Sequence, residues 1–192
     1  MTKEILLNVL QYMATVFGLL QGLLIIFKVK ENWVFLFAQS ITYVVWALGY
    51  NLWADVMEQG IYILLSVLGF SIWYQKFRSK LFEVDIHHIS VQNASICLNI
   101  LIILTFVFYK VLLKTNDPFP FLDAITTSIG FVATFLMARK VIECWVLWFI
   151  SDVLGIYIYM QIGANGLMFL NVVWMAMALI SFATWNYYKR GL

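Results

Sequence analysis

Long apolar runs separated by short polar breaks make up almost the whole chain. A helix rises about 1.5 Å per residue, so a run of about 18 residues or more crosses a hydrocarbon core of about 30 Å. The runs predict seven transmembrane helices, at Ile5–Phe27, Trp33–Tyr50, Ala54–Tyr74, Ala94–Leu113, Phe121–Ala138, Val141–Gln161 and Gly166–Tyr188. The longest polar stretch, Gln75 to Asn93, is predicted to be a connecting loop.

Composition agrees with this pattern and excludes a soluble domain. Hydrophobic residues are 64% of the 192 residues and charged residues 11%. We therefore expect one all-α transmembrane domain over residues 1–192. No basic run suggests a nucleic-acid partner, and Cys97 and Cys144 lack metal-ligand spacing, so no metal or cofactor is predicted. The adjacent loop residues His87 and His88 are interpreted as solvent-exposed.

The basic residues predict the orientation, because cytoplasmic loops of membrane proteins collect Lys and Arg. With the N-terminus outside, nine basic residues fall inside: Lys28, Lys30, Lys76, Arg78, Lys80, Arg139, Lys140, Lys189 and Arg190. Three fall outside: Lys3, Lys110 and Lys114. The C-terminus is therefore predicted to be inside.

The two ends of the chain resemble each other at a shift of 112 residues. The shift aligns identical residues in the pairs Lys28 and Lys140, Val29 and Val141, Glu31 and Glu143, Trp33 and Trp145, and Trp73 and Trp185. It carries residues 5–74, a first triplet of helices, onto residues 121–188 and leaves residues 94–113 as a linker helix. Three helices cross the membrane an odd number of times, so the chain ends on the opposite side. One linker helix returns it to the starting side, and both triplets then run in the same direction. We therefore predict a parallel 3+1+3 repeat, as in the SWEET sugar transporters, whose sites lie between the halves near mid-membrane.

The segment Glu143–Asp152 carries the strongest candidate chemistry. Trp145, Trp148 and Asp152 stand at i, i+3 and i+7, so a helix places them on one face. A carboxylate near the middle of a membrane helix costs about 2.5 kcal/mol or more, so Asp152 should face a bundle interior or a wet cavity. Indole faces beside a negative charge suit a flat cationic ring. Alternatively, the tryptophans form an interface belt, an interpretation that suits Trp145 better than Trp148, and Asp152 bonds to neighbouring helices.

Polar and aromatic residues elsewhere in the spans are further candidates for substrate binding. They are Gln39, Trp46, Gln59, Tyr62, Thr127, Asn171 and Trp174. Amides and phenols beside an aromatic surface suit a ligand with hydroxyl and amide groups. The alternative is hydrogen bonding between helices. No nucleophile motif, intramembrane His or pair of membrane carboxylates is present, so no enzyme is predicted.

Two stretches resemble the PnuC family of bacterial vitamin transporters. The first is Leu122–Asp152, with Asp-x-x-Thr-Thr followed by Ala-Arg-Lys-x-x-Glu-x-Trp-x-x-Trp, and the second is Ala54-Asp55 with Gln59, Tyr62, Gly69 and Trp73. The family's Trp-x-x-Trp-x-x-x-Asn/Asp motif falls on Trp145, Trp148 and Asp152. The resemblance covers most of the chain outside the linker helix and the loops.

The resemblance implies a SWEET-like facilitator in the bacterial inner membrane, with the homotrimeric assembly of related proteins. Its substrate would be unphosphorylated nicotinamide riboside, trapped inside by a separate cytoplasmic kinase. Thiamine is an alternative, since it also carries a cationic ring, and neutral riboflavin or nucleosides are less expected beside Asp152. A membrane scaffold without a solute path is the rival from another class. Because both prolines lie in a loop, alternating access would use rocking of the triplets, with flexing near Gly155 or Gly163.

Overall fold

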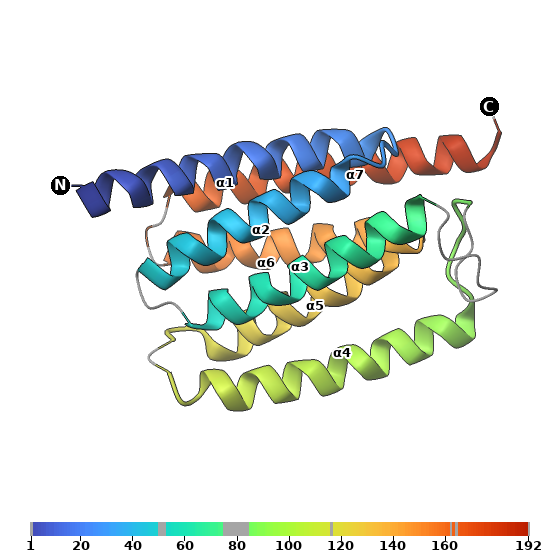
Figure 1. The fold of residues 1–192 in the computed structure, drawn as a ribbon. Helices are drawn as coiled ribbons and strands as arrows, with labels where there is room; N and C mark the ends of the chain where they lie inside the picture. Colours follow the sequence, from blue (N-terminus) through green and yellow to red (C-terminus); the bar gives the residue numbers. More distant parts are fainter. Residues whose placement is uncertain are drawn as a thin grey trace. The chain divides into compact units, whose positions relative to one another are not determined.

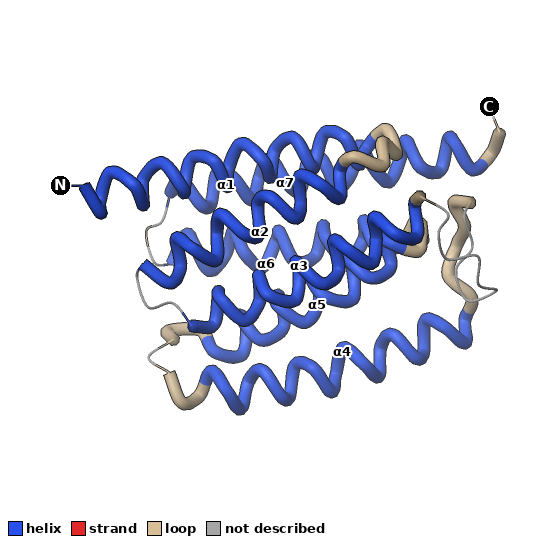
Figure 2. The backbone as a smooth tube through the Cα atoms, in the orientation of Figure 1, coloured by secondary structure: helices blue, strands red, loops and turns tan. Residues whose placement is uncertain are grey.

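The computed structural model describes residues 2–49, 53–74, 85–115, 117–161, 163 and 165–191. Its seven α-helices are α1 (Thr2–Ile26), α2 (Asn32–Gly49), α3 (Trp53–Trp73), α4 (Val91–Leu112), α5 (Pro120–Ala138), α6 (Cys144–Gln161) and α7 (Asn165–Lys189) (Figure 1). In the described part of the chain the remaining residues are loops and turns, and no strand is formed beyond an isolated bridge between His87 and Val141 (Figure 2). Six of them are long and apolar enough to cross a membrane, and α3 contains the shorter apolar segment Glu58–Trp73. The predicted all-α fold with seven helices is confirmed.

The chain forms two compact units, Met1–Val84 and Asp85–Leu192. In the first unit, α2 packs against both α1 and α3. In the second unit, α4 packs against α5, α5 against α6, and α6 against α7. Helix α5 is the centre of this unit, because 11 of its 19 residues are buried, whereas only Thr105 is buried in α4. Most of the α4 surface is therefore exposed.

An unusual turn joins α1 to α2. The Lys28 N–H donates to the Ile25 carbonyl at 3.0 Å and the Val29 N–H to the Leu24 carbonyl at 3.0 Å, the two bonds of a Schellman motif. Lys28 has a φ of 57°, where glycine is the usual residue. A lysine here places its positive charge beside the carbonyl end of α1, which the helix dipole favours.

The same turn recurs between α5 and α6. Lys140 has a φ of 58°, its N–H donates to the Met137 carbonyl at 3.0 Å, and the Val141 N–H donates to the Leu136 carbonyl at 2.9 Å. Each of these residues lies 112 positions after its counterpart in the first unit. The same shift relates the ends of α1 and α5, both ends of α2 and α6, and the starts of α3 and α7.

A pair of tryptophans packs edge to face in each unit. The Trp33 and Trp73 ring centroids are 5.7 Å apart at 78°, and those of Trp145 and Trp185 are 5.2 Å apart at 88°. Trp33 and Trp185 are fully buried, and such aromatic pairs contribute about 0.5–1.5 kcal/mol beyond burial. The two pairs are again related by the shift of 112 residues.

The start of α6 differs from the prediction, which placed it at Val141. The helix begins at Cys144, because the turn at Lys140 is followed by a bridge at Val141 and a second turn at residues 142–143. There the His87 N–H donates to the Lys140 carbonyl at 3.2 Å and the Ile142 N–H to the His87 carbonyl at 3.0 Å. The segment before α4 is therefore bonded to the α5–α6 connection.

The Glu143 carboxylate secures this connection. Its Oε1 lies 2.8 Å from His88 Nδ1 and its Oε2 accepts a hydrogen bond from the Ile89 N–H at 2.9 Å. His88 is solvent-exposed as predicted, with 46% side-chain exposure, but it also holds the Glu143 carboxylate. Sequence alone did not indicate this pairing, because His88 and Glu143 are 55 residues apart.

We expect Glu143→Ala to lower the melting temperature of the purified protein. The change removes both bonds of the carboxylate and leaves the Ile89 N–H unpaired, a loss on the order of 1–3 kcal/mol. Glu31→Ala is the matched control, because this repeat counterpart accepts a hydrogen bond only from Tyr74 Oη, at 3.5 Å, among the described contacts. Equal melting temperatures for the two variants would contradict a securing role for Glu143.

Candidate functional site

Asp152 is a buried acid near the middle of α6. It is the ninth of the 18 residues of the helix and is only 6% exposed. No hydrogen bond or ion pair joins its carboxylate to another described residue. Buried carboxylates in spans normally pair with another group or face a water-filled path. The position therefore suits recognition of a cation that comes from outside the chain.

Asn171 of α7 lies against the face of α6 that carries Asp152. A Cβ added at Gly155 would lie 3.1 Å from Asn171 Cγ and closer still to Oδ1. Gly155 follows Asp152 by three residues, so the two share one face of the helix. The missing side chain thus allows the amide to approach the α6 backbone within one turn of the acid.

The two tryptophans of the motif have different surroundings. Trp145 is 6% exposed and packs edge to face on Trp185, so its ring is part of the core near the start of α6. Trp148 is half-buried, as is Trp174 on α7, one turn from Asn171. Trp148 and Trp174 are therefore the aromatic candidates nearest in sequence to the acid and the amide. Thr127, another candidate in this unit, is half-buried on α5.

The remaining candidates belong to the first unit. Gln59 is 8% exposed, and no described residue bonds to its Oε1. Tyr62 donates to Glu58 Oε1 at 3.3 Å. Trp46 packs against Tyr43, with ring centroids 5.1 Å apart.

Gln39 lies on the side of α2 that faces α1. A Cβ at Gly18 would lie 3.1 Å from both the Gln39 Cδ and Oε1 atoms. The amide of this candidate therefore packs on a neighbouring helix.

Gly155 is the functional candidate whose role sequence reasoning missed. It was predicted as a point of flexing, whereas the structure places it under the Asn171 side chain. Gly163, the other predicted point, has a φ of 73° and lies in the turn before α7. The sequence does show a glycine three residues after the acid. It does not show which side chain packs against that glycine.

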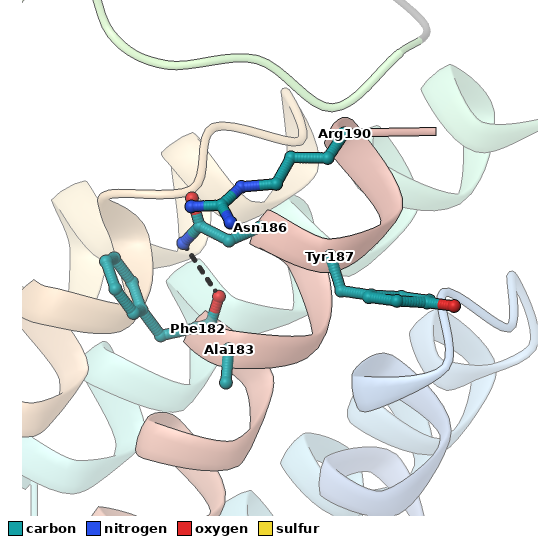
Figure 3. A pocket seen from close by; sticks show the side chains of 5 residues that line it. All are labelled: Phe182, Ala183, Asn186, Tyr187 and Arg190. Atoms are coloured by element: carbon teal, nitrogen blue, oxygen red, sulfur yellow. Dashed lines mark hydrogen bonds between the residues drawn. The ribbon is translucent and has the colours of Figure 1, made fainter. Parts of the chain in front are cut away.

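A shallow surface hollow lies over the last turns of α7 (Figure 3). It is lined by Phe182, Ala183, Asn186, Tyr187 and Arg190. Asn186 donates to the Phe182 carbonyl at 2.9 Å, and its side chain lies beside that of Arg190 while Tyr187 points the other way. None of the predicted site residues lines this hollow, so it is separate from the acid and amide of the candidate site.

Comparison with known proteins identifies the family. The family model described as nicotinamide mononucleotide transporter matches residues 8–187. The chain belongs to this transporter family. The PnuC resemblance is confirmed, and the family and its solved member are transporters, not enzymes.

A solved structure agrees with the fold of this nicotinamide mononucleotide transporter family member. The crystal structure of the vitamin B3 transporter PnuC is 18% identical, with a TM-score of 0.73. The match covers 96% of this chain and 88% of the other. None of the curated proteins matches the chain. The protein is thus a multi-pass membrane transporter with a PnuC-like fold.

Proposed function

We propose that the protein carries an unphosphorylated vitamin precursor with a cationic ring, nicotinamide riboside, into the cell. The observation that carries the proposal is the buried Asp152 at the middle of α6, which bonds to no described residue, with Asn171 of α7 packed on the same face of α6. Trp148 and Trp174 supply aromatic surface for the ring, and Trp145 supports the helix through Trp185. Gln59, Tyr62 and Trp46 are proposed to meet the uncharged part of the substrate.

The charge of the site favours a nucleoside over its phosphorylated form. Basic residues occur near the helix ends, at Lys3, Lys110 and Lys189, whereas the middle of α6 carries a carboxylate. A phosphate dianion would be repelled by Asp152 and would find no cation at that depth. Transport of nicotinamide riboside followed by phosphorylation inside, by a separate kinase, agrees with this charge pattern.

Thiamine is the second candidate, because its ring positive charge fits Asp152 equally well. Neutral riboflavin or a neutral nucleoside would not offset the cost of the buried carboxylate. A membrane scaffold makes a different prediction for Asp152, since a scaffold has no uptake to lose when the acid is replaced by an apolar residue.

The finer architecture is proposed as a parallel 3+1+3 repeat of the SWEET type. The recurring lysine turns, the paired tryptophans and the common shift of helix ends support it. The excess of basic residues in the segments assigned inside supports an outside N-terminus in a bacterial inner membrane. A homotrimer is proposed on the family resemblance.

The decisive experiment is uptake of labelled nicotinamide riboside into proteoliposomes without an ion gradient. We expect saturable uptake that stops when inside and outside concentrations are equal. Unlabelled nicotinamide riboside should compete, nicotinamide mononucleotide should not, and protein-free liposomes are the control. Competition by thiamine alone would assign the second candidate. No saturable uptake of either compound would contradict transport of a cationic-ring vitamin.

A further inference from the structure

The hollow at the end of α7 has an apolar part and a polar part (Figure 3). Its volume is about 410 Å³. Phe182 and Ala183 line the part nearer the middle of the helix. Asn186, Tyr187 and Arg190 line the part at the helix end, with an amide, a phenol and a guanidinium. Along the helix axis, the hollow therefore changes from apolar to polar toward the end of α7.

The guanidinium of Arg190 is available to a ligand. Its side chain is exposed, and no carboxylate of a described residue lines the hollow or pairs with it. Asn186 lies one turn earlier, beside Arg190, and uses one amide N–H for the Phe182 carbonyl at 2.9 Å, which leaves a second N–H. A guanidinium presents its N–H donors in a planar fork that fits the oxygens of a phosphate group. Arg190 and Asn186 together therefore suit a phosphate.

The surrounding charges also favour an anion at this end of the second unit. Helices α5, α6 and α7 pack in chain order and alternate in direction, so the α5–α6 connection lies at the same end as the last turn of α7. The described lysines, arginines and carboxylates at this end are Arg139, Lys140, Lys189 and Arg190 against Asp85 and Glu143. The Glu143 carboxylate is already bonded to His88 and to the Ile89 N–H. At the opposite end, Lys110 and Lys114 are balanced by Asp117 and Asp123. An anion is therefore attracted to the end that carries Arg190.

The two parts of the hollow together match a phospholipid better than a free anion. In a membrane protein, an exposed apolar surface on a spanning helix meets acyl chains, and Phe182 is exposed in this way. Tyr187 is exposed as well, and tyrosine is enriched at the depth of the lipid headgroups because its ring is apolar and its hydroxyl polar. A free phosphate would contact only the polar part and would leave Phe182 and Ala183 uncovered.

We propose that the hollow is a binding site for one anionic phospholipid. The lipid phosphate accepts hydrogen bonds from Arg190 and Asn186, and an acyl chain lies over Phe182 and Ala183. The bound lipid holds the end of α7 at the depth of the headgroups. The proposal goes beyond the proposed function, because it does not depend on the molecule that is transported.

The test titrates the purified, detergent-solubilised protein with phosphatidylglycerol and follows the melting temperature. A ligand that binds the folded state raises this temperature as its concentration exceeds the dissociation constant. Phosphatidylglycerol should stabilise the wild type more than phosphatidylcholine, whose headgroup has no net charge. Glycerol phosphate, which has no acyl chain, should have no effect. Arg190→Gln should weaken the apparent affinity for phosphatidylglycerol about fivefold, the effect of one basic residue near an anionic lipid surface.

Lys189→Gln is the matched control. It removes the same charge one residue earlier, and Lys189 is exposed but does not line the hollow. A basic residue at a helix C-terminus interacts favourably with the last carbonyls, so both variants lose that contribution to stability. Only Arg190→Gln should also lose affinity for phosphatidylglycerol.

Four results would overturn the lipid site. Equal affinity of the wild type and Arg190→Gln would show that the guanidinium does not hold the phosphate. An equal loss in Arg190→Gln and Lys189→Gln would show that only net charge matters. Equal stabilisation by phosphatidylcholine would contradict selectivity for an anionic headgroup. Stabilisation by glycerol phosphate as strong as by the lipid would assign the hollow to a free phosphate instead.

Discussion

Replacing Asp152 by leucine is expected to abolish saturable uptake without destabilising the protein. The carboxylate is buried at mid-helix and bonds to no described residue, so the folded protein gains little from it. A charged side chain at that depth costs about 2.5 kcal/mol or more, and an apolar residue removes the cost. We therefore expect the melting temperature of Asp152→Leu to equal or exceed that of the wild type.

The effect on transport has a different physical origin. A cationic ring bound beside the carboxylate loses its charge partner in either Asp152→Leu or the isosteric Asp152→Asn. Removing one member of a buried charge pair costs about 2 kcal/mol or more, so affinity should fall by roughly 30-fold or more. Proteoliposome uptake and calorimetry with nicotinamide riboside measure the loss.

Asp85→Asn is the matched control, because it removes a carboxylate of the same type at an exposed position before α4. Uptake by this variant should be unchanged. Uptake by Asp152→Asn at the wild-type level would contradict the proposal that Asp152 binds the cationic ring. Lower stability of Asp152→Leu would show that the carboxylate has a structural partner, as the interhelical alternative predicts.

Replacing Gly69 by alanine is expected to cause a large loss of stability. An added Cβ would lie 2.5 Å from Trp33 Cδ2 and Cε3 and 2.6 Å from Cε2. The Trp33 ring is rigid, fully buried and packed on Trp73, so it has little room to move. Overpacking of this kind costs about 1–3 kcal/mol. The melting temperature of Gly69→Ala should therefore fall clearly below that of the wild type.

Gly60→Ala on the same helix provides the comparison. No atom lies within 4 Å of a Cβ added there, and alanine is the better helix former by about 0.5–1 kcal/mol. This variant should melt at or above the wild-type temperature. If both variants melt alike, the close approach of α2 and α3 at Trp33 is not required for stability.

The helices could be predicted from the sequence because their signal is local. Apolar runs long enough to span a membrane predicted all seven helices. The motif between Asp123 and Asp152 indicated the family. The start of α6 was wrong by three residues, since a lysine with a positive φ at Lys140 is not a recognised stop signal. A helix end depends on a few turn residues, whereas a helix is indicated by many apolar residues. Helix ends are therefore harder to predict than the helices themselves.

The roles of single side chains depended on contacts between distant segments. Trp145 and Trp148 are three residues apart and look alike in the motif, yet only Trp145 packs on Trp185. The sequence predicted only that His88 is exposed, whereas the structure places it in hydrogen-bond contact with Glu143. The same limit applies to Gln39, whose amide packs at Gly18.

The sequence by itself determined that this protein is a helical membrane protein of a transporter family, with an acid in the middle of one apolar segment. Hydrophobicity and charge act on each segment separately, so those features can be read along the chain. Only the tertiary structure decided that the Asn171 side chain lies against Gly155, three residues from that acid, and that Trp145 packs on Trp185. Both depend on which faces of neighbouring helices meet, and that choice is made by packing across the fold.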